Sequence, residues 1–317
     1  MEIRRIPRRV RPFLLAGLVA LVVLALVAMA AAVALSRVRV LTEQRLTERM
    51  VDVALWSPAL GRRTTVRLLL PLAYEDRPQA RWPSVYLLHG CCDDYLSWTR
   101  STDIEELSAT SDVLVVMPDG GRAGFYSDWL DGPGWETFHT VELPALLADR
   151  YRSNDRRTVA GISMGGLGAL GYTARHPGQF LAAASFSGIV HTRRSPDESR
   201  AYLGLLRSQD EHPYRLWGAP TVDAAIWATH NPYDLAPRLT AVPLFVSVGD
   251  GRPGPLNPDG AEDPIESSLL AENEALQERL TQVRANATFD FYGPGSHDWP
   301  YWERALHRAW PLLTDAL

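Results

Sequence analysis

The chain has 317 residues, of which 46% are hydrophobic and 22% are charged, a composition typical of globular proteins and not of disordered ones. The formal net charge of −5 gives no reason to expect nucleic-acid binding. All basic residues other than histidine are arginines, which excludes chemistry that depends on a Schiff-base lysine or a P-loop lysine.

The N-terminus carries a basic cluster followed by a long apolar run. Five arginines precede an uncharged segment over residues 13–35, which is long enough to cross a hydrocarbon core of roughly 30 Å as a helix. By the positive-inside rule, residues 1–12 are expected in the cytoplasm and the remainder outside. The alternative is a cleaved secretory signal, because small residues end the run. We therefore expect a single-pass protein of the cell membrane with an extracytoplasmic domain, secreted if the segment is cleaved.

The rest of the chain alternates short apolar runs with helical patterns. Residues 36–59 are predicted to be a juxtamembrane connector and residues 60–317 a single α/β domain. Strands are expected over 64–71, 84–90, 112–119, 156–163, 182–188, 243–250 and 288–295, and helices over 103–110, 136–150, 164–176, 266–284 and 299–315. Continuously apolar strands between helices predict a mostly parallel sheet with helices on both faces.

The second expected strand ends at His89 and Gly90, where the chain enters a turn. In such sheets the functional residues gather just after the strands, and a His-Gly turn at this position can supply a backbone amide to an oxyanion. The N–H of Cys91 is therefore a candidate donor. Cys91 and Cys92 are adjacent and offer no metal-binding spacing. We expect them to be free thiols packed in the turn rather than a strained vicinal disulfide.

A serine lies between two glycines farther along, in "AGISMGGLGAL" at residues 160–170. Ser163 occupies a G-x-S-x-G turn between an expected strand and an expected helix, which is the context of a nucleophile elbow. Gly161 and Gly165 suit this sharp turn because it leaves no room for a Cβ on either residue. The N–H of Met164, at the start of the helix, is a second candidate donor to an oxyanion.

A nucleophilic serine needs a basic partner, and in α/β-hydrolases the chain order is serine, acid, histidine. His297 is the best candidate base among the eight histidines, because it lies in a glycine-rich loop directly after the last expected strand. Two acids precede it. Asp250 directly follows a strand, and Glu266 opens the next helix. Their spacing does not choose between them.

The chain resembles the esterase D superfamily of α/β-hydrolases, and within it the antigen 85 mycolyltransferases of actinobacteria. The resemblance covers roughly residues 60–312 and is carried by "FYSDWLDGPGWETFHTVELPALL", "AGISMGGLGAL", "HPGQF", "SFSG" and "GPGSHDWPYW". It implies an α/β-hydrolase fold and acyl transfer on carboxylic esters through an acyl-enzyme on Ser163, without metal or organic cofactor. His297 matches the family's histidine. The family's acid is a glutamate that opens the helix after a loop matching residues 249–253, which implies Glu266 and leaves Asp250 as the alternative.

The resemblance also implies contacts with the substrate. Trp299 matches the tryptophan that lines the family's sugar pocket, and the alternative role for it is packing of the final helix. The family's trehalose-contacting aspartate and arginine are replaced by His89 and Cys92, so His89 is a substrate-binding candidate but trehalose specificity is not implied. The expected partners are a lipid or other carboxylic ester and an acceptor, which is water, a sugar or glycerol. The alternative function is that of a catalytically inactive hydrolase-like domain serving as a binding module of the cell envelope.

Overall fold

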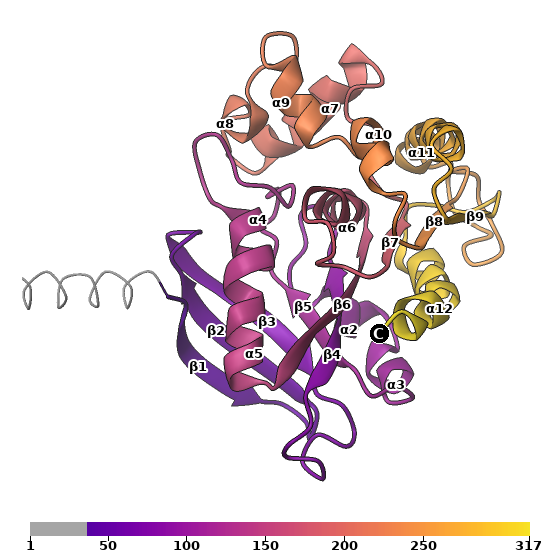
Figure 1. Cartoon of the computed structure of the whole chain (residues 1–317). Coiled ribbons are helices and arrows are strands. Elements are labelled where there is room, and N and C mark those ends of the chain that lie inside the picture. The colour runs from indigo at the N-terminus through magenta and orange to yellow at the C-terminus, as the bar shows by residue number, and fades with distance from the viewer. Residues whose placement is uncertain (1–36) are drawn as a thin grey trace, which may run out of the picture.

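The computed structural model describes residues 37–317, which form a central sheet covered by helices on both faces (Figure 1). The sheet has nine strands in the order β1-β2-β3-β5-β4-β6-β7-β8-β9. Their bounds are β1 (Arg39–Arg45), β2 (Met50–Ser57), β3 (Arg62–Leu69), β4 (Trp82–Leu88), β5 (Leu114–Pro118), β6 (Ser153–Ile162), β7 (Ala183–Phe186), β8 (Leu244–Val248) and β9 (Ala287–Phe291).

The sheet is mostly parallel, as the sequence predicts. From β5 through β4, β6, β7 and β8 to β9 every neighbouring pair runs parallel, whereas β1, β2, β3 and β5 pair antiparallel. All seven expected strands are present, within a few residues of their predicted bounds. The carboxyl ends of the parallel strands therefore open toward one edge of the sheet, where the loops that follow them can meet.

The helices of the described chain vary widely in length. Their bounds are α2 (Ser97–Ser101), α3 (Ile104–Ser108), α4 (Trp135–Thr137), the π-helical turn η1 (Phe138–Glu142), α5 (Leu143–Arg150), α6 (Met164–Arg175), α7 (Pro196–Ser208), α8 (Tyr214–Trp217), α9 (Ala224–Thr229), α10 (Pro232–Leu235), the 3₁₀ turn η2 (Ala236–Arg238), α11 (Pro264–Gln282) and α12 (Trp299–Asp315). The five expected helices are present. The sequence did not predict helices α7–α10, which gather at one end of the molecule (Figure 1).

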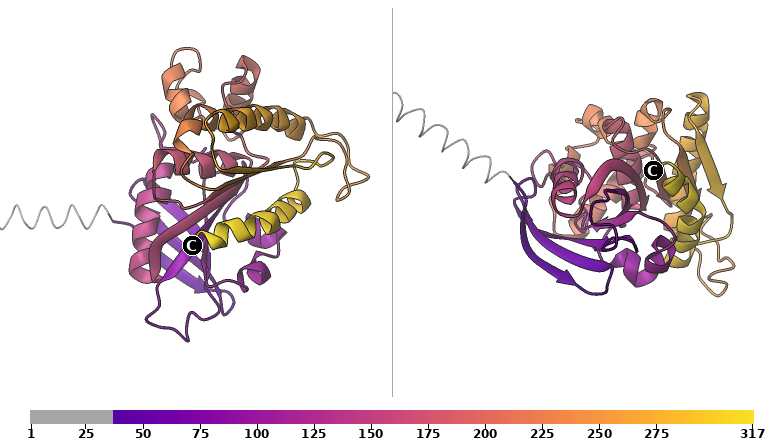
Figure 2. Two further views of the ribbon diagram at one scale, coloured as in Figure 1. Left: turned by 45° about the vertical axis from the view of Figure 1, so that its right-hand side comes forward. Right: turned by 60° about the horizontal axis from the view of Figure 1, so that its bottom comes forward.

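Alternating side chains of the strands fill two separate cores. In β4, Tyr86 and Leu88 pack in the core under α5, α6 and α11, whereas Val85 and Leu87 pack in the core under α2, α3 and α12. Both sets are fully buried or nearly so, which explains why the second half of this strand, residues 85–88, carries no charged side chain. Figure 2 shows α11 and α12 on opposite sides of the neighbouring strands.

The predicted connector over residues 36–59 is wrong in one respect, because it contains two strands of the sheet. β2 pairs with β3 along its whole length, and β1 pairs with β2. Burial alternates along β2, with Val51, Val53 and Leu55 facing the core. This period of two was present in the sequence. The folded domain therefore begins close to residue 39 and not at residue 60.

The predicted N-terminal segments over residues 1–12 and 13–35 lie outside the described residues. Within residues 37–317, no helix combines the length and the apolar character that crossing a bilayer would require.

Candidate active site

Ser163 occupies a strained turn between the end of β6 and the start of α6. Its φ is 52°, in the left-handed region, and its N–H donates to the Phe186 carbonyl at 2.9 Å. A Cβ on Gly161 would lie 2.1 Å from the Gly165 carbonyl oxygen, and one on Gly165 would lie 2.3 Å from the Leu88 carbonyl oxygen. Backbone atoms fill both positions, so only glycine fits there.

His297 and Glu266 form a hydrogen-bonded pair. The His297 ring follows β9, and its Nδ1 lies 2.8 Å from Oε2 of Glu266 at the start of α11. The Glu266 side chain is fully buried, and its Oε1 accepts hydrogen bonds of 2.7 Å from the Ser187 hydroxyl and from the Gly249 N–H. A carboxylate at Nδ1 favours the tautomer that leaves Nε2 free to accept a proton.

Two residues that the sequence analysis did not identify hold the His297 loop in place. Asp263 caps α11 and also accepts a hydrogen bond of 2.9 Å from the His297 N–H. Trp302 packs edge-to-face against the His297 ring, with 4.8 Å between ring centroids. The order of Asp263, Pro264 and an acid at Glu266 is a recognisable helix-start signal, which would have identified Asp263 as a cap.

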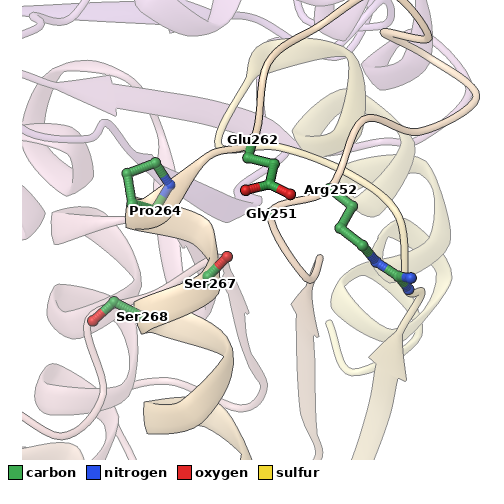
Figure 3. A pocket seen from close by; sticks show the side chains of 6 residues that line it. All are labelled: Gly251, Arg252, Glu262, Pro264, Ser267 and Ser268. Carbon is green, nitrogen blue, oxygen red and sulfur yellow. The ribbon is translucent and has the colours of Figure 1, made fainter.

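Asp250, the alternative acid, is bonded to Arg252 and not to His297 in the described chain. Its carboxylate accepts hydrogen bonds of 2.9 Å and 2.5 Å from the Arg252 guanidinium, and these bonds lower the pKa of Asp250. Arg252 lines a hollow of about 660 Å³ at the start of α11, together with Glu262 and Ser267 (Figure 3). The structure thus brings Glu266, and not Asp250, into contact with His297.

The loop after β4 lies directly against the serine turn. A Cβ on Gly90 would be 3.4 Å from the Ser163 Cβ, and the Cys92 N–H donates to the Arg122 carbonyl at 2.6 Å. Across residues 37–317, no group accepts a hydrogen bond from the N–H of Cys91 or of Met164. Two unpartnered amides beside a serine are suited to binding a negatively charged oxygen.

Ser163 and His297 line the same cavity, which has a volume of about 460 Å³. Cys91 and Cys92 also line it, and both thiols are free. Burial, with a further contribution from Cys92, raises the pKa of the Cys91 thiol. The Cys91 thiol is therefore protonated near neutral pH and is a poor nucleophile. Apolar lining comes from Ile189, Ala201, Leu205, Ile265 and Leu269.

Helix α7 contributes part of this lining, which the sequence analysis missed. Glu198, Tyr202 and Leu205 come from this helix. Its start carries a clear signal, because the Ser195 hydroxyl caps the Glu198 N–H and a proline follows the cap. The hollow in Figure 3 adjoins the cavity, since Pro264 and Ser268 line both.

Neither proposed substrate contact lies on the cavity wall. His89 is 1% exposed, its Nδ1 lies 2.7 Å from the Gly90 carbonyl oxygen, and its Nε2 accepts a hydrogen bond of 2.8 Å from the Gly120 N–H. The His89 ring is buried and both of its nitrogens contact backbone groups, so it holds the loop after β4 in place. We therefore do not retain His89 as a substrate-binding candidate. Trp299 packs edge-to-face on Trp98 and Trp302, with ring centroids 5.4 Å and 5.2 Å away. This is its alternative packing role, and its contact with substrate stays a prediction.

Metal binding has no obvious location in the described chain. Within residues 37–317, no group of three or more histidine, cysteine, aspartate or glutamate side chains is arranged to hold a metal ion.

Comparison with known sequences gives a consistent family. A sequence model of the esterase family, described as "Putative esterase", matches residues 57–313. The chain is 34% identical over 257 residues to the diacylglycerol acyltransferase/mycolyltransferase Ag85B of Mycolicibacterium smegmatis, covering 74% of this chain and 77% of that relative. It is 32% identical over 278 residues to Ag85C of Mycobacterium avium, an enzyme of the same description, covering 82% of this chain and 76% of that relative.

Solved structures share the fold at lower identity. The structure of Mycobacterium tuberculosis MPT51 (FbpC1) superposes with a TM-score of 0.70 at 24% identity, covering 87% of this chain and 98% of that chain. An S-formylglutathione hydrolase from Agrobacterium tumefaciens gives a TM-score of 0.67 at 17% identity, covering 88% of this chain and 99% of that chain. At these identities the likeness concerns the fold alone, and it is that of α/β-hydrolases.

Proposed function

The chain belongs to the esterase family and has the antigen 85 acyltransferases among its relatives, and on this premise we propose that it transfers acyl groups through a Ser163–His297–Glu266 triad. Membership of this family makes it an enzyme of the esterase and acyltransferase class. The observation that carries the triad is the contact of 2.8 Å between His297 Nδ1 and Glu266 Oε2, with His297 lining the same cavity as Ser163.

The proposed reaction begins when Nε2 of His297 removes the proton from the Ser163 hydroxyl as its oxygen attacks the ester carbonyl. The carbonyl oxygen becomes an oxyanion, which accepts hydrogen bonds from the N–H groups of Cys91 and Met164. Each donor of this kind is typically worth about 2.7–4 kcal/mol at the transition state. Glu266 stabilises the imidazolium.

The tetrahedral intermediate then expels the alcohol, which takes the proton from His297 and leaves the acyl group on Ser163. A water molecule or a second alcohol then gives its proton to His297 and attacks the acyl-enzyme. The second tetrahedral intermediate collapses by breaking the bond to Ser163 Oγ, which takes the proton back from His297, and the acid or the new ester is released. The apolar lining of the cavity suits a lipid acyl chain. A sugar or glycerol acceptor fits the relatives described as mycolyltransferases and diacylglycerol acyltransferases.

The proposal includes a location. The apolar segment over residues 13–35 anchors the chain in the cell membrane, with the catalytic domain on the extracytoplasmic side. Cleavage of this segment would release the domain as a secreted enzyme.

Replacement of Ser163 tests the proposal directly. We expect Ser163→Ala to lower the hydrolysis of a p-nitrophenyl ester by about a thousandfold or more, because the nucleophile is lost. Labelling by a fluorophosphonate probe should disappear with it. Ser268→Ala is the matched control, since Ser268 lines the same cavity but is exposed, and it should keep both readouts. Full activity in pure Ser163→Ala protein would refute the assignment, and an unreactive wild-type chain would favour the inactive binding module.

A further inference from the structure

The cavity at Ser163 holds one acidic side chain that the proposed reaction does not use. Glu198 lies in the first turn of α7 and lines the cavity among apolar residues. It is 8% exposed, so water solvates little of its carboxylate. A buried carboxylate is costly unless each oxygen has a hydrogen-bond partner.

Only one of the two Glu198 oxygens has such a partner. Oε1 accepts hydrogen bonds from the Arg194 guanidinium, one of them at 2.8 Å from Nε. Oε2 is shielded from solvent, and no group within residues 37–317 donates to it. Glu198 itself lines the cavity, and the terminal torsion of a glutamate is soft, so the carboxylate can turn toward a ligand bound there.

The hydroxyl group of Tyr202, which also lines the cavity, is already in use. Tyr202, one turn farther along α7, donates its hydroxyl to Oε1 of Glu272. Oε2 of Glu272 accepts hydrogen bonds of 2.9 Å and 2.8 Å from the N–H groups of Val190 and His191. Tyr202 therefore has no second hydroxyl proton for Glu198, and no donor within residues 37–317 reaches the free oxygen.

We propose that Glu198 Oε2 accepts a hydrogen bond from a hydroxyl group of the substrate, so that the enzyme prefers apolar esters that carry a hydroxyl. This inference rests on the proposed function of the same cavity. Arg194 already balances the charge of Glu198, which favours a neutral donor over a second cation. A site built to bind a hydroxyl discriminates against an analogue without one, because the buried oxygen is then left unpaired.

The test compares matched esters with the full-length chain. p-Nitrophenyl octanoate is compared with counterparts hydroxylated at the chain end and near the carboxyl group, which probe the acyl side. Glycerol octanoate is compared with propyl octanoate, which probes the alcohol side. We expect wild-type kcat/KM to be about tenfold higher for the hydroxylated member of at least one pair, as for a hydrogen bond to a charged group.

Substitution at position 198 should remove this preference selectively. We expect Glu198→Met to bring the kcat/KM ratio of that pair close to one while hydrolysis of plain octanoate persists. Glu198→Gln keeps the shape of the side chain and a weaker hydrogen bond, so we expect it to give an intermediate kcat/KM ratio. This second variant tests the proposal even if Glu198→Met does not fold. Asp197→Asn is the matched control, because it removes a carboxylate from the same turn of α7 at a side chain that is 85% exposed. It should keep the wild-type ratio.

Two results would overturn parts of the proposal separately. The role of Glu198 alone would be refuted if the wild-type kcat/KM ratio were near one in every pair of esters. It would also be refuted if kcat/KM fell equally for plain and hydroxylated esters in both Glu198 variants. Absence of hydrolysis of every ester together with absence of fluorophosphonate labelling of wild-type protein would refute the proposed function, and the specificity with it.

Discussion

At the residue scale, the choice of acid depends on which carboxylate can hold a buried position. Glu266 is fully buried and accepts hydrogen bonds from Ser187 and Gly249 in addition to its contact with His297. Asp250 is partly exposed and bonded to Arg252, so its negative charge is already balanced. A buried carboxylate orients an imidazolium more effectively, because the local dielectric screens their attraction less.

Replacing each acid separately tests this choice. We expect Glu266→Gln to lower kcat by about a hundredfold or more, because the imidazolium loses its counter-charge, whereas Asp250→Asn should stay within about twofold of wild type. The measurement is steady-state hydrolysis of p-nitrophenyl octanoate, with circular dichroism to confirm folding. A larger loss of kcat from Asp250→Asn than from Glu266→Gln would mean that Asp250 is the acid of the triad.

A second buried acid, Glu272, should make stability depend on pH. Burial raises its pKa to about 7 from an ordinary value of 4.5. Its contribution to the free energy of unfolding is fully present below pH 4.5, where the folded and unfolded states are both protonated. As the pH rises through 7, that contribution is lost, because ionisation favours the unfolded chain.

Glu272→Gln cannot ionise, so its stability relative to wild type should improve with rising pH. We expect the difference in unfolding free energy to shift toward the variant by about 3 kcal/mol as the pH rises from 4.5 to 7. Urea unfolding at a series of pH values measures this shift. Glu274→Gln is the control, since Glu274 lies exposed on the same helix, and it should show no such trend. A constant difference between Glu272→Gln and wild type would contradict the prediction.

At the element scale, the two N-terminal strands contribute more than their exposed position suggests. β1 is exposed along most of its length, but β2 buries Val51, Val53 and Leu55 against the core and pairs with β3. Burying an aliphatic side chain of this size is worth about 1.5–3 kcal/mol. Together the three are worth about 6 kcal/mol, which is comparable to the whole stability of many domains.

Shortening the chain tests this contribution. A chain that begins at residue 60 lacks β1 and β2 and should aggregate or lose cooperative unfolding, whereas one that begins at residue 37 should fold like the full chain. Thermal unfolding followed by circular dichroism distinguishes the two. Equal midpoints for both shortened chains would mean that β2 is dispensable.

At the scale of the whole molecule, the site is assembled from loops that are distant in the sequence. Cys91 follows β4, Ser163 follows β6, Glu266 opens the helix after β8, and His297 follows β9. These strands run parallel in one sheet, so the loops after their carboxyl ends meet at the same edge. The folded domain forms this site from residues 37–317, and the proposed anchor precedes it.

Membrane attachment can therefore be separated from activity. We expect the full-length chain to remain with membranes after alkaline extraction, because an apolar segment over residues 13–35 is long enough to span the bilayer. A chain beginning at residue 37 should appear in the soluble fraction with unchanged ester hydrolysis. Fractionation with immunoblotting measures this. Recovery of the full-length chain in the wash at its full mass would refute the anchor.

The sequence by itself determined the elements of the parallel sheet and the strained serine turn. Apolar runs and helical periods are local patterns, and so is the G-x-S-x-G spacing around Ser163. Short helices such as α8 and α10 carry no comparable period, and tertiary packing stabilises them, so the sequence did not predict them.

Only the tertiary structure decided which polar groups meet. The fold alone brings Glu266 to His297, 31 residues farther along the chain, whereas Asp250 bonds to Arg252, only two residues away. The fold likewise buries His89 with both ring nitrogens bonded and places Glu198 on the cavity wall. The physical reason is that hydrogen bonds and burial join residues that are distant along the chain, whereas secondary-structure patterns depend on neighbours.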